Sequence, residues 1–394
     1  MKFRTRAIHV GNAPDPQTGA VVQPINPATT FVQLGAGEWG KFDYSRSGNP
    51  TRSAVQETLA SLESGYGALA FASGMAATHC ATMLLKSGEH IVGGQDIYGG
   101  SYRLFHKVCN TAGIEVTLAD LQDLDSLAAA LRPNTRMIWL ESIGNPRLTV
   151  PDLPAIIKFA HDHSLLVAVD NTFASPVLLR PLELGADIVM HSATKSLGGH
   201  SDCLSGVLVV RDKELFDKLY FIQNATGAVL SPFDSFLLSR GLKTLELRVH
   251  EQCRTALRIA SYLELHPMVN RVLYPGLPSH PDHARAAQLL SGGFGSIITF
   301  EAKCDFEATR RIVKSTKLFG LAVSLGAVES LIEQPATMSH ASYDAAARAK
   351  AGITDSLIRL SVGLEAYQDL IADLDQALAM ANAGVAPGYG EYGL

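Results

Sequence analysis

Short apolar runs alternate with amphipathic helical patterns between residues 47 and 240, and few folds accommodate this order. We expect strands in ALAFASG, HIVGGQD, IEVTLAD, RMIWLES, LLVAVDN, DIVMHSA and SGVLVVR. Helical patterns such as RSAVQETLASLESG, GMAATHCATMLLKSG and DLPAIIKFAHDHS lie between them. Strands that alternate with helices form a mostly parallel sheet with helices on both faces. Residues 47–240 are therefore predicted to form an α/β domain.

The segments on either side have a different character. Residues 1–46 are rich in Pro, Gly and Thr with little periodicity, so we expect an extended segment that lies across a partner. A long helical stretch, residues 231–266, leads into a smaller C-terminal domain over residues 241–394. FGSIITFEA and SLIRLSVGLE are its expected strands, DLIADLDQALAMANA is an expected terminal helix, and GVAPGYGEYGL is an expected loose tail.

Composition excludes several classes of protein. The net charge of -5 and the pI near 6.2 provide no basic surface for nucleic acid or an anionic membrane. No apolar run approaches the roughly 18 residues that a membrane span needs, and no apolar stretch follows the basic N-terminus as in a secretory signal. The five cysteines lack CxxC spacing, which argues against a zinc site and indicates reduced thiols in a cytoplasmic protein.

The strongest functional signal lies in residues 165–201. Asp170 ends the expected strand LLVAVD, and Lys195 lies in the turn SATKSLGGHS after the strand ADIVMHS. The carboxyl ends of parallel strands face the ligand crevice of such a sheet. A carboxylate there can hold the protonated ring nitrogen of pyridoxal phosphate, and a lysine can form a Schiff base with it. The alternative is a buried strand end beside a surface lysine.

Nearby residues favour the cofactor. Ser192 and Thr194 bracket the lysine with hydroxyls suited to a phosphate, and glycines after them allow close approach of a ligand. In FASGMAA, Ser73, Gly74 and Met75 lie where a strand turns into a helix. The first amides of a helix lack intrahelical partners and bind phosphate well. Such a turn is common by itself but becomes more specific together with SATK.

These motifs carry a resemblance to a known family. DNTF, HSATK, GGHSD and FDYSRSGNPT resemble the cystathionine-metabolising (trans-sulfuration) family of fold-type I pyridoxal-phosphate (PLP) enzymes, and the similarity extends to SVGLE near the C-terminus. The resemblance implies an aspartate-aminotransferase-like α/β fold, with a mostly parallel sheet in the large domain and a smaller α+β C-terminal domain. It also implies a cytoplasmic carbon–sulfur lyase that binds PLP and forms at least a dimer, with a homotetramer as the expected assembly.

The resemblance assigns cofactor contacts residue by residue. It gives the phosphate to the amides of Gly74 and Met75 and the hydroxyls of Ser192 and Thr194. Tyr98, in DIYGGSYR, is expected to stack on the pyridine ring and to act as a catalytic acid or base. Asn145, in ESIGNP, is expected to bond the phenolic oxygen of PLP. Asp170 is expected to bond the ring nitrogen, and Lys195 to form the Schiff base and move protons.

Further positions are assigned to the substrate and the neighbouring subunit. Tyr44 and Arg46, in FDYSRSGNPT, are expected to reach the phosphate of the adjacent subunit, whereas a surface YSR turn is the alternative. Arg359 lies in the apolar run LIRLSVGLE, where a charge must be paired, and the family uses it for the substrate α-carboxylate. Ser324 is expected beside it, and Asp43 resembles an acidic residue that can hold the distal amine of cystathionine.

The member of the family is harder to choose. Gly100 departs from the cysteine of methionine γ-lyase, whereas Val323 resembles that enzyme and departs from the glutamate of many γ-lyases and γ-synthases. FDYSRSGNPTR, IQNATGAVLSPFD and YPGLPSHP look most like cystathionine γ-lyase, which implies cleavage of L-cystathionine to cysteine, 2-oxobutanoate and ammonia. Cystathionine γ-synthase, acting on an O-acylhomoserine, cystathionine β-lyase and methionine γ-lyase remain alternatives. A catalytically silent homologue would be expected to lack the lysine, aspartate or arginine, and all three are present.

Overall fold

The computed structural model describes residues 1–341, 343, 348 and 351–382, and its larger sheet contains every strand predicted between residues 47 and 240. The strand order is β1-β7-β6-β5-β4-β2-β3. Neighbouring strands are parallel except at β7, which is antiparallel to both β1 and β6. The strands are β1 (Gly67–Phe71), β2 (His90–Gly94), β3 (Glu115–Ala119), β4 (Thr135–Glu141), β5 (Leu166–Asp170), β6 (Ile188–His191) and β7 (Gly206–Val210).

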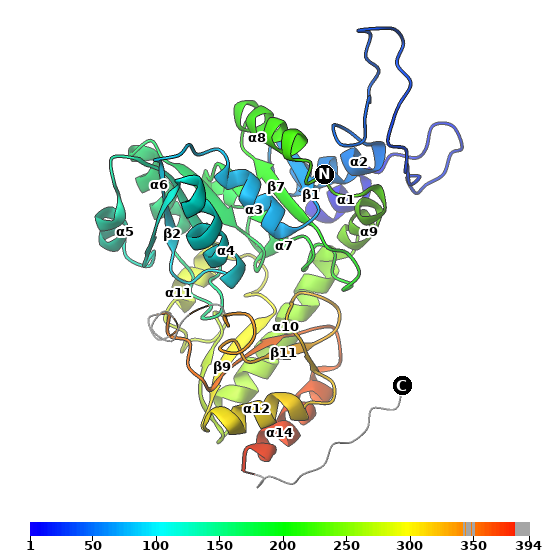
Figure 1. Ribbon diagram of the computed structural model, residues 1–394. Helices are drawn as coiled ribbons and strands as arrows, with labels where there is room; N and C mark the ends of the chain where they lie inside the picture. The colour runs from blue at the N-terminus through cyan, green and yellow to red at the C-terminus, as the bar shows by residue number, and fades with distance from the viewer. Residues whose placement is uncertain (342, 344–347, 349–350, 383–394) are drawn as a thin grey trace.

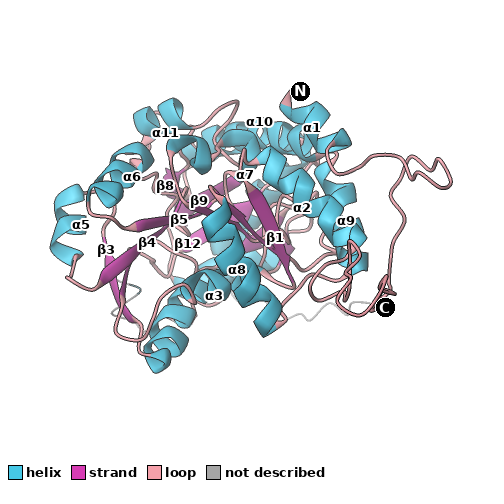
Figure 2. Ribbon diagram, turned by 90° about the horizontal axis from the view of Figure 1, so that it is seen from above, coloured by secondary structure: helices cyan, strands magenta, loops and turns pink. Residues whose placement is uncertain are grey.

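Helices cover both faces of this sheet (Figure 2). The strand side chains alternate between two cores: Val167 and Val169 of β5 pack in one, and Ala168 packs in the other. The first core is closed by α2 (Pro50–Leu62), α5 (Leu124–Ala130), α6 (Leu153–Asp162) and α7 (Ser175–Leu178). The second is closed by α3 (Gly74–Thr82), by the π-helical turn Leu104–Cys109 that follows α4 (Gly99–Arg103), and by α8 (Lys213–Thr226).

The C-terminal part contains a smaller sheet with strand order β10-β11-β12-β9-β8. Its strands are β8 (Val269–Leu273), β9 (Ile297–Ala302), β10 (Gly320–Leu321), β11 (Leu331–Glu333) and β12 (Leu357–Ser361). Helices α12 (Phe306–Ser315) and α14 (Tyr367–Ala379) pack against it, and α11 (His283–Leu289) lies before β9. Short 3-10 turns occur at Asn110–Ala112, Pro181–Leu184 and Met380–Asn382. The tail expected from residue 384 lies outside the described residues.

One long helix joins the two sheets. The helical stretch predicted over residues 231–266 is divided into α9 (Pro232–Leu242) and α10 (Leu245–Glu264). Leu245 and Val249 of α10 pack in the core of the large sheet, whereas Ile259 packs in the core of the small one. The helix therefore fixes the small sheet against the large one, as its course in Figure 1 shows. The proposed domain boundaries at residues 46 and 240 stay predictions.

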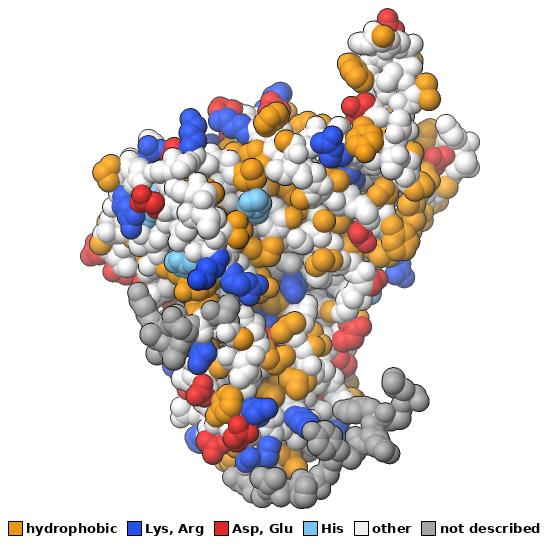
Figure 3. Space-filling view, viewed as in Figure 1, with side chains coloured by type: hydrophobic (Ala, Val, Ile, Leu, Met, Phe, Trp, Pro, Cys, Tyr) orange, Lys and Arg blue, Asp and Glu red, His pale blue; other side chains and the backbone are white. Residues whose placement is uncertain are grey.

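The N-terminal segment is not entirely extended, contrary to the prediction. Residues Phe3–His9 form α1, whose Ala7 is buried in the first core. Beyond α1 the chain runs as long loops that project from the body (Figure 1) and carry hydrophobic side chains on their surface (Figure 3). Val32, Leu34 and Trp39 are 99%, 83% and 70% exposed. None of the helices in the described ranges has the length and apolar character needed to cross a bilayer.

Candidate active site

A cavity of about 310 Å³ opens at the carboxyl end of the large sheet and is closed from the other side by residues of the small sheet. The predicted site residues outside the N-terminal segment all line it: Gly74, Met75, Tyr98, Asn145, Asp170, Ser192, Thr194, Lys195, Ser324 and Arg359. They come from strand ends and loops far apart in the sequence. The fold therefore brings together the lysine, the aspartate and the arginine on which the sequence argument rested.

Lys195 lies in the turn after β6, and its Nζ donates a hydrogen bond to Ser324 Oγ at 2.8 Å. Burial, together with the positive charge of Arg359, lowers the pKa of Lys195 from 10.5 to about 8, while the charge of Glu333 opposes this shift. Ser324 has a positive φ of 132°, an unfavourable backbone conformation for a serine. A larger share of the lysine amine is therefore neutral at physiological pH than in an ordinary lysine, and the amine is held by one hydroxyl.

Asp170 ends β5 and is buried at the floor of the cavity. Its Oδ1 accepts hydrogen bonds from Thr172 N at 3.0 Å and Thr172 Oγ1 at 2.5 Å. Burial raises the pKa of Asp170, while these bonds and the charge of His191 lower it. A buried carboxylate is stabilised by a cation or a proton donor. The protonated nitrogen of a pyridine ring would supply both.

The opposite end of the cavity has the character of an anion site. Ser73 caps α3, with its Oγ accepting a hydrogen bond from Ala76 N at 3.1 Å. The amides of Gly74 and Met75, in the first turn of the helix, have no intrahelical partner. A Cβ on Gly74 would lie 3.0 Å from the Cβ of Ser192, so glycine permits this close approach. These amides and the Ser192 hydroxyl fit a phosphate.

Thr194 is already hydrogen-bonded within the chain. Its hydroxyl donates to Ser205 O at 3.1 Å and accepts from Ser205 N at 2.9 Å. Both bonds tie the lysine turn to the residue that precedes β7. The Thr194 hydroxyl therefore positions the lysine turn through contacts within the chain itself.

Arg359 lies on β12 and is 4% exposed. Its Nη2 is 3.1 Å from Glu333 Oε1, and its Nη1 donates to Asn145 Oδ1 at 3.0 Å. Glu333 lies directly opposite on β11 and was missed from the sequence. The available signal was a glutamate in the apolar run SLIEQP, since a charge on a buried strand needs a partner as much as Arg359 does.

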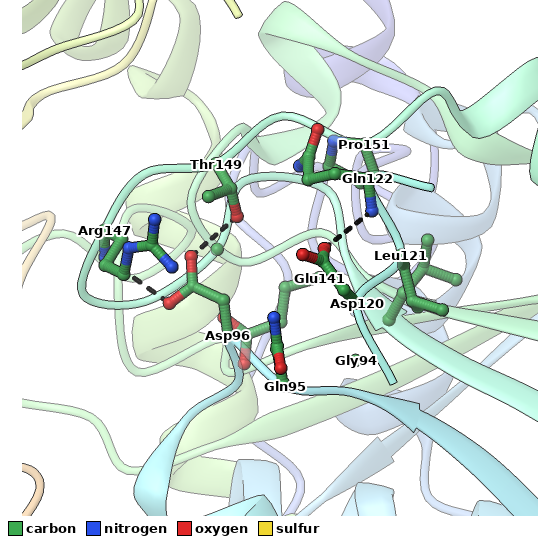
Figure 4. Close-up of a pocket in the computed structure, with 12 residues that line it drawn as sticks. Gly94, Gln95, Asp96, Asp120, Leu121, Gln122, Glu141, Arg147, Thr149 and Pro151 are labelled. Carbon is green, nitrogen blue, oxygen red and sulfur yellow. Dashed lines mark hydrogen bonds between the residues drawn. The ribbon is translucent and has the colours of Figure 1, made fainter. Parts of the chain in front are cut away.

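Tyr98 directly precedes α4 as its N-cap and is also held by a buried acid that the sequence argument missed. Its backbone N donates to Glu141 Oε1 at 2.6 Å. Burial raises the pKa of Glu141 well above its usual value, and the neighbouring Asp170 raises it further. A second, smaller cavity lies behind Glu141 (Figure 4), where Asp96 accepts a hydrogen bond from Thr149 Oγ1 at 2.6 Å. Glu141 lines both cavities.

The N-terminal candidates do not reach the cavity of their own chain. Arg46 donates from Nη1 to Asn224 O at 2.6 Å, and its guanidinium lies 5.7 Å from the centroid of the Tyr44 ring. Both side chains are exposed. Asp43 lines a separate hollow beside Lys41 and Arg52. Within one chain, therefore, Asp43, Tyr44 and Arg46 are apart from the Lys195 cavity.

Comparison with known proteins supports the same cofactor, PLP, that the geometry of the cavity indicates. The family model described as Cys/Met metabolism PLP-dependent enzyme matches residues 4–379. A cystathionine beta-lyase of Coxiella burnetii is 51% identical over 95% of this chain and 97% of its own. A cystathionine gamma-synthase of Mycobacterium bovis is 49% identical over 95% of this chain and 96% of its own.

A solved structure extends the likeness to the backbone. The cystathionine gamma-lyase of Lactobacillus plantarum, complexed with L-serine, superposes with a TM-score of 0.94 at 45% identity and covers 98% of this chain and 100% of its own. These matches confirm the expected fold class, the enzyme class and the cofactor, while the activities for which the three relatives are named differ. The chain belongs to the Cys/Met metabolism family of PLP-dependent enzymes.

Proposed function

We propose that this enzyme is a cystathionine γ-lyase, which converts L-cystathionine and water to cysteine, 2-oxobutanoate and ammonia by α,γ-elimination. One observation carries the proposal: Lys195, Asp170 and Arg359 line a single cavity beside the first turn of α3. An amine, a carboxylate and a buried guanidinium are the groups needed to hold PLP and an amino acid together. Membership of the trans-sulfuration family restricts the substrates to sulfur amino acids and their precursors.

The residues present fit the cofactor. The amides of Gly74 and Met75 with the hydroxyls of Ser192 and Thr194 would hold its phosphate, and Asp170 would hold its ring nitrogen. Asn145 accepts from Arg359 through Oδ1, so its Nδ2 is the atom left to donate to the phenolic oxygen. The ring of Tyr98 would stack on the pyridine. When bound, PLP supplies an electron sink that stabilises negative charge on the substrate carbons.

The chain's own residues then perform binding and proton transfer. Arg359 binds the substrate α-carboxylate with its planar fork, and the nearby Glu333 keeps that guanidinium oriented before substrate arrives. Lys195 Nζ, whose pKa is about 8, removes the proton from the substrate Cα and, after it has given that proton up, removes the proton from Cβ. Tyr98 Oη donates a proton to the departing γ-sulfur. The small-sheet residues that close the cavity exclude bulk water during these steps.

Two positions bear on the choice of substrate. Val323 lines the mouth of the cavity and is 58% exposed, so it offers an apolar wall where many relatives have a glutamate. Asp43 of a neighbouring subunit would hold the distal amine of cystathionine. An apolar wall tolerates several thioethers, whereas a charge discriminates strongly. We therefore expect cystathionine cleavage with side activity on homocysteine or methionine.

The keto acid released from cystathionine tests the proposal. 2-Oxobutanoate indicates γ-cleavage, whereas pyruvate as the main product would replace it with β-lyase activity. Formation of cystathionine from an O-acylhomoserine and cysteine, faster than any cleavage, would identify a γ-synthase. Preference for methionine over cystathionine would identify a methionine γ-lyase. The same assay on Val323→Glu should show kcat/KM shifted toward cystathionine, and a shift toward methionine would contradict our account of the pocket.

The assembly and location follow from the same residues. We propose that Tyr44 and Arg46 complete the phosphate site of a neighbouring subunit, because both lie on exposed loops outside their own cavity. The catalytic unit would then be a dimer, and two such dimers would form a homotetramer. The five cysteines are unpaired, which suits the reducing cytoplasm in which we place the enzyme.

A further inference from the structure

Two loops at the carboxyl edge of the large sheet carry side chains that face the candidate cofactor site. Residues 95–98 follow β2 and end at Tyr98, and residues 142–152 follow β4 and include Asn145. Both of these side chains line the cavity. β2 and β4 are neighbouring parallel strands, so the two loops leave the sheet side by side. The spacing of the loops therefore decides where the tyrosine ring and the asparagine amide lie relative to each other.

Side chains continue the connection between these strands where their backbone pairing ends. The register pairs of β2 and β4 run as far as Gly93 and Trp139. Beyond that pair, two acids join the loops: Asp96 in the first loop and Glu141 at the end of β4. We call these two residues the brace acids. The cofactor contacts and the proton transfers proposed above use neither of them.

Each brace acid is bonded to the loop that follows the other strand. Glu141 Oε1 accepts a hydrogen bond from the backbone N of Tyr98 at 2.6 Å. Asp96 Oδ2 accepts from Thr149 Oγ1 at 2.6 Å, and its Oδ1 accepts from Arg147 N at 3.4 Å (Figure 4). The bonds of the two acids run in opposite directions between the same pair of loops. Together they fix the spacing of the loops in both directions.

The loop that contains Asn145 is shaped around Asp96. A Cβ on Gly144 would overlap Asp96 Oδ2, so the glycine lets this carboxyl lie against the backbone one residue before Asn145. Gly144 N donates to Thr149 O at 2.9 Å, which closes the loop on itself. Asp96 thus lies against the loop on both sides of Asn145, and a displacement of its carboxyl would displace the amide.

The environment of both brace acids favours the neutral carboxyl. Burial, together with the charges of Asp170 and Asp96, raises the pKa of Glu141 well above its usual value, while its hydrogen bond opposes the shift. Burial also raises the pKa of Asp96, opposed by its bond to Thr149 and by the charge of Arg147. A neutral carboxyl still accepts a hydrogen bond through its carbonyl oxygen. An amide of the same shape can therefore replace either acid.

We propose that the brace acids are positioning residues for the cofactor contacts. Glu141 fixes the backbone of Tyr98 and, with it, the ring that stacks on the pyridine. Asp96 fixes the loop that presents the Asn145 amide to the phenolic oxygen. This inference rests on the proposed PLP function of the cavity. Each acid acts through another residue, so its effect on PLP binding should depend on the presence of that residue.

Double-mutant cycles distinguish positioning from packing. The apo form of the full chain and its variants are titrated with PLP, and the dissociation constants are compared. Glu141→Leu should weaken PLP binding about tenfold in the parent chain but less than about twofold in the Tyr98→Ala chain, because the ring that it positions is then missing. Asp96→Leu should depend on Asn145 in the same way, with a large effect in the parent chain and a small one in the Asn145→Ala chain.

Conservative variants and a matched control complete the design. Glu141→Gln and Asp96→Asn keep an acceptor oxygen, so each should retain PLP affinity within about threefold of the parent value. Asp373 is a buried acid outside the cavity that accepts bonds from the backbone N atoms of residues 317–319 at 2.7, 2.8 and 3.0 Å. Asp373→Leu should lower thermal stability without changing PLP affinity. Thermal unfolding of each apo chain checks the fold, and if one leucine variant misfolds, the cycle of the other acid decides.

The outcomes separate this inference from the proposed function. Equal weakening of PLP binding with and without the positioned residue would show that the acid only packs and would overturn the proposal. Leucine variants that bind PLP as tightly as the parent, or amide variants as weak as the leucine variants, would also overturn it. Coupled effects with near-parent amide variants support the positioning role. Failure of the parent chain to form a borohydride-reducible absorbance band with PLP would instead overturn the assignment of the cavity.

Discussion

The environment of the Lys195 amine predicts how the rate of PLP uptake depends on pH. Burial and the charge of Arg359 place its pKa at about 8, below the usual 10.5. The neutral amine is the nucleophile that attacks the PLP aldehyde. Uptake of PLP by the apo chain should therefore accelerate as pH rises and reach half its maximal rate near pH 8, measured by stopped-flow absorbance. A midpoint near the ordinary lysine value would contradict the burial of this amine, and Lys195→Ala should remove the reaction.

Arg359 permits a sharper test of substrate binding than simple truncation. Arg359→Lys keeps a cation beside Glu333 but loses the two-pronged geometry that matches a carboxylate. We expect kcat/KM to fall about 100-fold for every amino-acid substrate, with changes in both kcat and KM. Arg271→Lys is the control, because Arg271 pairs with Glu301 at 2.8 Å outside the cavity. Equal effects of the two substitutions would show that Arg359 has only a structural role.

The site residues found from sequence and those missed differ in a physical way. Asp170 and Lys195 are recognisable because strand ends and glycine-rich turns are local features of the chain. Glu333 and Glu141 acquire their roles from contacts across strands, with Arg359 and with the turn at Tyr98. Those contacts depend on register and on the docking of the small sheet, which no local pattern specifies.

At the scale of the element, α3 couples helix stability to the cofactor. Ser73 caps this helix, and the amides that follow it form the proposed phosphate site. Ser73→Ala should destabilise the apo chain by about 1 kcal/mol and weaken PLP binding several-fold. Asp305 caps α12 in the same way, with Oδ1 accepting from Ala308 N at 2.8 Å. Asp305→Ala should cost similar stability without changing PLP affinity, as thermal unfolding and cofactor titration would show.

The elements that differed from prediction owe their structure to tertiary contacts. The α1 sequence FRTRAIH is short and lacks a side-chain N-cap, so nothing local favours a helix. It is held by burial of Ala7 and by ion pairing of Arg4 with Glu246 at 2.8 Å. Gly241, near the end of α9, packs against Gly198 O so closely that no Cβ would fit. The strands were predictable because their apolar runs suit a sheet buried on both faces.

At the scale of the whole molecule, the N-terminal loops expose large apolar side chains that the rest of the described chain does not cover. Val32, Leu34 and Trp39 are strongly exposed there, close in sequence to Tyr44 and Arg46. Apolar groups concentrated on a projecting segment favour contact with another chain. A second copy would bury these side chains and bring Arg46 toward a neighbouring phosphate site, which joins the assembly to the chemistry.

Complementation between inactive chains tests this arrangement. In a mixed dimer of Lys195→Ala and Arg46→Ala, the site on the Arg46→Ala chain has its own lysine and receives the intact arginine from its neighbour. Random exchange makes half of the dimers mixed, and each has one complete site, so activity should return to about a quarter of the parent value. Lys195→Ala mixed with Arg359→Ala is the control, because both residues line one chain's cavity and no site is restored. If native mass spectrometry detects the mixed dimers and activity stays absent, Arg46 serves its own chain and the shared site is wrong.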